Sequence, residues 1–74
     1  MSVPGAGTSQ VHIDEAARQL ELAVHDARVA FDCIQLGELD RAHTSAITAR
    51  AAADAAETQL RAALGEGTGA RDDS

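Results

Sequence analysis

The side chains that could take part in catalysis are three histidines and one cysteine, with carboxylates near two of the histidines. Asp40 and His43 are three residues apart beside Glu38, a spacing at which a carboxylate can orient an imidazole on one helix face. A helix cap at Asp40 and an exposed His43 explain the same residues without chemistry, because aspartate is favoured at helix starts. Glu21 and His25, at i and i+4, suit a surface pair equally well. We therefore predict no catalytic residues and no enzymatic activity.

Metal and cofactor sites are not indicated by the residue spacing either. A structural zinc ion requires four cysteine or histidine ligands at close spacing, whereas the histidines here are spread from His12 to His43. Cys33 is the only cysteine, which excludes an internal disulfide. The glycines lack the preceding strand and the following lysine of a phosphate-binding loop. We predict that the protein uses no metal and no other cofactor.

The charge of the chain narrows the class of partner. Twelve acidic residues against six arginines give a formal net charge of −6, and no segment is basic. Nucleic acids and anionic membranes attract concentrated lysine and arginine, so we expect neither as a partner. No apolar run reaches the roughly 18 residues of a membrane span. Residues 1–9 carry no positive side chain and no apolar stretch, so we expect no secretory signal and a cytoplasmic protein.

Proline and glycine divide the 74 residues into three parts. Residues 1–9 should form a flexible arm and residues 65–74 a flexible acidic tail. Residues 10–64 contain no proline and one glycine, Gly37, and are rich in alanine, leucine, glutamate and arginine, which favour helices. Gly37 supplies a helix stop, Asp40 an N-cap, and Gly65 a second stop. The sequence therefore predicts an all-α antiparallel hairpin with helices over about residues 10–36 and 40–64.

The first predicted helix carries two separate apolar rows. With Ile13 at position a of a heptad, positions a, d and e form one continuous apolar arc. Position c carries a second row, Leu22, Val29 and Leu36, roughly 150° from the centre of that arc. We predict that the first arc packs within the hairpin and that the second row, with the neighbouring Cys33, binds a partner. One chain leaves open which row faces the second helix.

The second predicted helix is dominated by alanine, which allows close approach of helices but buries little surface per residue. The whole chain has 17 alanines and a single aromatic residue. A hairpin with so few large side chains is only marginally stable alone, so we expect it to associate as a four-helix bundle dimer. The predicted hairpin core comprises Ile13, Leu20, Val24, Phe31, Ile34, Ala49, Ala53, Ala56 and Leu60.

This layout resembles the Rop family of dimeric helical hairpins that bind RNA. The resemblance lies in two helices of this length, the turn Leu36-Gly37-Glu38-Leu39-Asp40 and a short acidic tail. It implies a dimeric four-helix bundle. Binding RNA in the Rop manner would need a cationic helix face, which this chain lacks.

Two further resemblances concern size and form. Ala30, Gly37, Ala42 and Ala49 are similar to one tetratricopeptide unit, without its aromatic positions, and the hairpin is similar in size to small co-chaperones of type III secretion. We predict a non-catalytic interaction or assembly module that acts as a homo-oligomer, with itself or another protein as partner. The alternative is an accessory subunit or small co-chaperone that docks its second apolar row on a different protein.

Overall fold

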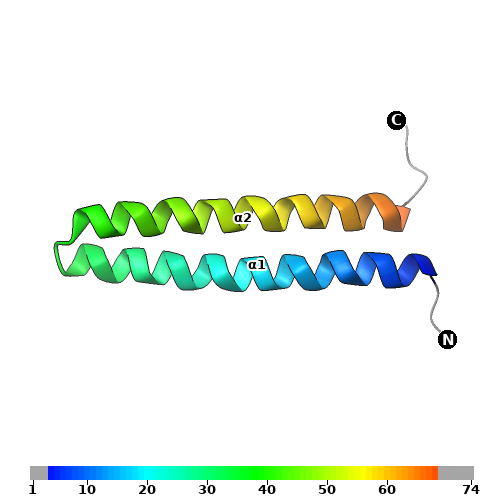
Figure 1. Ribbon diagram of the computed structural model, residues 1–74, viewed down its shortest axis with the longest axis horizontal. Coiled ribbons are helices and arrows are strands. Elements are labelled where there is room, and N and C mark those ends of the chain that lie inside the picture. The colour runs from blue at the N-terminus through cyan, green and yellow to red at the C-terminus, as the bar shows by residue number, and fades with distance from the viewer. Residues whose placement is uncertain (1–3, 69–74) are drawn as a thin grey trace.

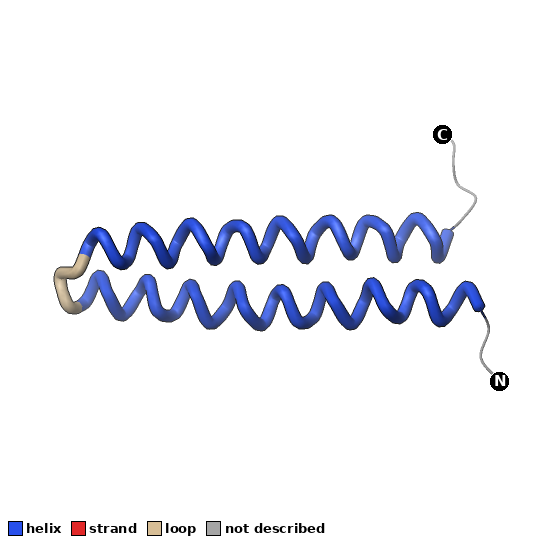
Figure 2. Tube along the Cα trace, in the orientation of Figure 1, coloured by secondary structure: helices blue, strands red, loops and turns tan. Residues whose placement is uncertain are grey.

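The chain folds into two long antiparallel helices that lie side by side and are joined by a short turn (Figure 1). Helix α1 spans Pro4–Gln35 and helix α2 spans Leu39–Thr68. The structure, a computed structural model, describes residues 4–68; residues 1–3 and 69–74 of the predicted arm and tail lie outside the described residues. The predicted all-α two-helix hairpin is confirmed (Figure 2).

Both helices extend beyond their predicted bounds. Helix α1 begins at Pro4, inside the segment expected to be an arm, and α2 continues past Gly65 to Thr68. Proline suits the first turn of a helix because its missing N–H would have no intrahelical partner there. Gly65 does not adopt the left-handed conformation that ends a helix, so α2 continues through it.

The turn between the helices is built around Gly37. Its φ of +77° lies in the left-handed region, which glycine enters without the steric cost of a Cβ. The N–H of Glu38 donates to the carbonyl of Cys33 at 2.8 Å, and the N–H of Gly37 donates to that of Ile34 at 3.0 Å. These two bonds form a Schellman motif, which satisfies carbonyls left over at the end of α1.

The N-cap of α2 lies two residues earlier than expected. The N–H of Ala42 donates to the carbonyl of Glu38 at 3.0 Å, so Glu38 occupies the N-cap position. Asp40, predicted as the cap, lies instead in the first turn of α2. A carboxylate there still interacts favourably with the positive end of the helix dipole.

The seam between the helices is lined by small side chains. Its buried residues fall on two neighbouring heptad rows of each helix: Ala16, Ala30 and Cys33 on α1, and Ala42, Ala52, Ala56 and Ala63 on α2. Small residues let two helix backbones approach closely along their whole length. No large side chain in the described part of the chain is fully buried, so the hairpin has a seam but no core of large residues.

One pair of polar side chains joins the two helices at the edge of the seam. His12 of α1 and Gln59 of α2 are joined by a part-buried hydrogen bond of 2.6 Å between Nδ1 and Oε1. Within the described residues, no buried side-chain nitrogen or oxygen lacks a hydrogen-bond partner. Over the same residues, neither helix is apolar enough along a sufficient length to span a membrane.

Candidate functional site

The most prominent feature of the hairpin surface is the number of large apolar side chains exposed on it. Twelve such residues are at least 40% accessible in the single chain. They are Val11, Ile13, Leu20, Leu22, Val24, Phe31, Ile34 and Leu36 of α1 and its end, and Leu39, Ile47, Leu60 and Leu64 of α2. Single exposed aliphatic residues are ordinary, but contiguous groups of them mark interaction surfaces. Whether these residues form an interaction surface therefore depends on how they are distributed around the two helices.

On α1 the centre of the seam lies between two heptad rows. One contains Ala16 and Ala30, and the other contains Cys33 and the residues at seven-residue steps before it. At 100° per residue, the row of Leu20 lies about 90° to one side of this centre and the row of Phe31 about 130° to the same side. The row of Leu22 lies about 70° to the other side. The two apolar rows of the sequence therefore flank the seam on opposite sides.

Helix α2 also has an exposed row on the side of the seam that carries Leu20. This row runs at seven-residue steps through Leu39, Ala46, Ala53 and Leu60. It lies about 70° from the seam centre of α2, and because the helices are antiparallel it lies beside the Leu20 row of α1. We call the resulting surface the broad apolar face. It comprises Ile13, Leu20, Val24, Phe31 and Ile34 of α1 and Leu39, Ala46, Ala53 and Leu60 of α2, all of them exposed.

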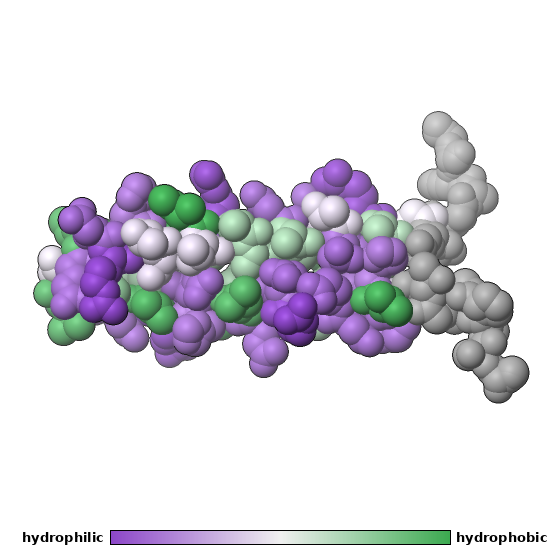
Figure 3. Space-filling view, viewed as in Figure 1, coloured by the Kyte–Doolittle hydropathy of each residue, from purple (hydrophilic) through white to green (hydrophobic). Residues whose placement is uncertain are grey.

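The opposite face carries the other predicted row and is less apolar. Leu22 and Leu36 are exposed there and Val29 is half-buried, while Cys33 is only 4% accessible because it lies in the seam. In Figure 1, α1 runs from right to left below α2. Because the helix is right-handed, the opposite face is then the one turned toward the viewer. In this view, strongly apolar side chains form separate patches divided by hydrophilic ones (Figure 3).

The predicted core residues occupy different positions from those expected within one chain. The large ones, Ile13, Leu20, Val24, Phe31, Ile34 and Leu60, are all exposed on the broad apolar face. Of the alanines, Ala56 is buried, Ala49 is half-buried and Ala53 is exposed. The physical reason is that the alanine row of the apolar arc, which contains Ala16 and Ala30, faces α2. The neighbouring rows of large side chains therefore lie beside the seam and not within it. Their packing in a core remains a prediction about an assembled form.

Leu39 is a further member of this face. The sequence places it in the turn, but it is the first residue of α2 and is exposed. Its spacing was the available signal, because Leu39 precedes Leu60 by three heptads in the row of Ala46 and Ala53. Recognising it required the true start of α2.

The charged residues pair locally along the exposed surface. Arg18 binds Glu15 at 3.0 Å and Arg41 binds Glu38 at 2.8 Å, while Arg61 pairs with Glu57 as its spacing suggests. The rows that form the broad apolar face contain no charged residue. Covering these rows would therefore bury no charged side chain of their own, while the row of Arg50 and Glu57 borders them on α2.

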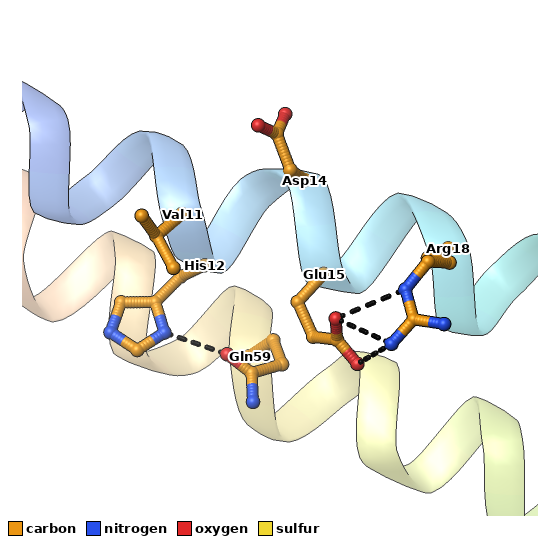
Figure 4. A pocket seen from close by; sticks show the side chains of 6 residues that line it. All are labelled: Val11, His12, Asp14, Glu15, Arg18 and Gln59. Carbon is orange, nitrogen blue, oxygen red and sulfur yellow. Dashed lines mark hydrogen bonds and ion pairs between the residues drawn. The ribbon is translucent and has the colours of Figure 1, made fainter.

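Glu15 is the carboxylate most affected by its neighbours. The amide of Gln19 donates to it at 2.9 Å and the guanidinium of Arg18 donates at 3.0 to 3.2 Å. These hydrogen bonds, that of Gln19 first, lower the pKa of the Glu15 carboxyl from its ordinary value of 4.5. Figure 4 shows Glu15 and Arg18 beside His12 and Gln59, which line an open surface depression together.

The residues weighed for catalysis are not brought into an enclosed site. His43 is exposed, and Asp40 lines only an open depression with Arg41, Thr44 and Ser45. Among the described residues, no three histidine, cysteine or carboxylate side chains are grouped closely enough to hold a metal ion. The broad apolar face is therefore the candidate functional site.

No family model, no curated protein and no solved structure matches the chain.

Proposed function

We propose that this protein is a non-catalytic interaction or assembly module that acts as a homodimer, with two hairpins packed face to face as a four-helix bundle. The observation that supports the proposal is that adjacent heptad rows of exposed, uncharged side chains from both helices form the broad apolar face. A face of this kind on a single layer of two helices is half of a two-layer core.

The size of the face suits a stable dimer. Residues 13–34 of α1 extend over about 33 Å at 1.5 Å per residue, and two helices side by side span about 20 Å. Covering such a face removes roughly 650 Å² per copy and 1,300 Å² in all, which reaches the ~1,200–2,000 Å² range of specific interfaces. Leu20, Val24, Phe31 and Ile34 are 44–63% accessible in the single chain, so removing the rest of their surface from water contributes about 1 kcal/mol per side chain before the losses of association.

A second candidate function rests on the opposite face. Leu22, Val29 and Leu36 recur at seven-residue steps there, and Leu22 and Leu36 are exposed. An accessory subunit or small co-chaperone would dock this row on a different protein and would not need a second copy of itself. The two functions differ in the mass of the purified protein.

The test is the mass in solution of purified chain at low micromolar concentration, measured by light scattering. We expect twice the 7.6 kDa of one chain. Leu20→Glu places a charge in the centre of the face, where burial without a partner is costly, and should weaken the dimer at least tenfold.

Ile47→Glu is the matched control, because Ile47 is similarly accessible, 49% against 44% for Leu20, but lies on the side of α2 turned away from the seam. It should leave the dimer intact. A well-folded monomer for the unmodified chain contradicts the proposal. A dimer that is lost in Leu22→Glu and kept in Leu20→Glu assigns the interface to the opposite face instead.

A further inference from the structure

We infer that the two copies pack with α1 of each hairpin on α2 of the other, so that both turns lie at the same end of the bundle. This inference rests on the proposed dimer and adds its orientation. The orientation matters because it places all four chain ends together at the other end of the bundle.

The first observation is the unequal distribution of side-chain size across the broad apolar face. Helix α1 contributes large residues to it, among them Leu20, Val24 and Phe31, whereas the middle of the α2 row consists of Ala46 and Ala53. Close packing requires that large side chains of one surface meet small ones of the other. A second copy therefore fits best when the large row of α1 lies on the small row of the partner's α2.

A two-fold axis allows two face-to-face arrangements of such hairpins, and they differ in which helices meet. An axis parallel to the helices places α1 on the partner's α2 and both turns at one end. An axis perpendicular to the helices and lying between the layers places α1 on the partner's α1 and the turns at opposite ends. The second arrangement opposes large rows to large rows and small rows to small rows, so the two layers would be wedged apart along one side.

The register of the hairpin also fits the first arrangement. Gln35 and Leu39 flank the turn, and His12 bonds Gln59, so residues at one level have numbers that sum to about 71–74. A parallel two-fold axis keeps these levels between copies. The partner's Ala53 then lies level with residues 18–21 of α1, beside Leu20, and its Ala46 lies level with residues 25–28, between Val24 and Phe31. The two alanines of the opposing row therefore lie where α1 presents large side chains, and only at the end of the face does the partner's Leu60 lie beside Ile13.

The experiment is a distance measurement between spin labels in the full-length dimer. Cys33→Ala removes the native thiol from a seam already formed by alanines, and Gln35→Cys adds a label at the exposed end of α1 beside the turn. Turns at one end place the two labels about 30 Å apart, since only the bundle cross-section separates them. Turns at opposite ends separate them by more than about 40 Å along the helix axes.

Ala51→Cys in the same background is the control, because this exposed residue lies near the middle of the hairpin. Its label pair should give a distance of about 30 Å in either orientation, which shows that the labelled protein is dimeric. A long Gln35 distance with a short Ala51 distance overturns the orientation and leaves the proposed dimer standing. A single-chain mass and no intermolecular distance at either site overturn the proposed function itself.

Discussion

Side-chain size at the seam positions determines which surface of each helix faces the other. The fully buried residues are alanines and Cys33, whereas every large aliphatic and aromatic residue of α1 remains partly or largely accessible. Leucine or phenylalanine at Ala16, Ala30 or Ala56 would hold the backbones apart and remove close contact along the rest of the seam. The alanine content of the sequence is thus used for contact between the two helices of one chain.

Local hydrogen bonds at Glu15 lead to a prediction about pH. Because its folded-state pKa is lowered, its contribution to stability is present above the unfolded value near 4.5 and is lost as pH falls through the folded value. We expect the Glu15 carboxyl to titrate below 4.5 when followed by NMR. In Gln19→Ala, which removes the largest cause, the midpoint should move up toward 4.5. An unchanged midpoint in this variant would contradict the assignment.

Residue spacing anticipated only part of this local network. The i,i+4 spacing favours a pair between Asp14 and Arg18, but Arg18 binds Glu15, and Asp14 accepts a hydrogen bond from Gln10 at 2.8 Å. The bidentate contact of Arg18 with Glu15, from Nε to Oε1 and from Nη2 to Oε2, explains the preference, since two parallel hydrogen bonds are stronger than one. Sequence spacing alone does not distinguish two neighbouring carboxylates that are both within reach.

At the scale of the helices, the turn depends on one backbone conformation. Gly37 has a positive φ with nothing within 4 Å of the position a Cβ would take, so a substitution there meets backbone strain and no collision. Gly37→Ala should therefore lower the free energy of unfolding by about 1–2 kcal/mol, the cost of the left-handed conformation for an alanine.

Gly65→Ala is the matched opposite case. Gly65 lies within α2, has no positive φ and has open space around the position of a Cβ, so alanine should raise the free energy of unfolding by up to about 1 kcal/mol. Chemical denaturation followed by circular dichroism measures both variants at equal protein concentration. Equal effects of the same sign at the two glycines would contradict the conformations described for them.

The helix bounds show how far propensity alone determines an element. The hairpin and its turn at Gly37 followed from composition and from a single glycine in 55 residues, since few other breaks were available. The start of α2 at Leu39 and the passage of α2 through Gly65 did not follow, because they depend on the hydrogen bonds of Glu38 and on the φ of one glycine. Because the predicted helix begins at residue 40, the sequence alone does not assign Leu39 to the broad apolar face.

At the scale of the whole molecule, the hairpin is a single layer of two helices. A single layer buries the seam and leaves the rest of each helix accessible, so it lacks the two-layer core of most domains. Association with a second layer would make folding and dimerisation one linked process. The stability of such a protein depends on its concentration.

We therefore expect the Tm to rise with protein concentration. A tenfold increase in concentration favours a folded dimer over unfolded monomers by about 1.4 kcal/mol per dimer. Thermal unfolding measured from micromolar to hundreds of micromolar chain gives the comparison, with Leu20→Glu as the variant whose Tm should no longer depend on concentration. A constant Tm for the unmodified chain over this range would show that one layer is stable alone.

The sequence by itself determined that this chain is helical, that it turns once near Gly37 and that α1 carries two apolar rows, because propensity, a lone glycine and a repeat of seven are local properties. Only the tertiary structure decided which surface of α1 faces α2. That choice depends on how closely the alanines of both helices approach one another, a property of the pair and not of either helix. It placed the seam between the two apolar rows and left both of them exposed on opposite faces.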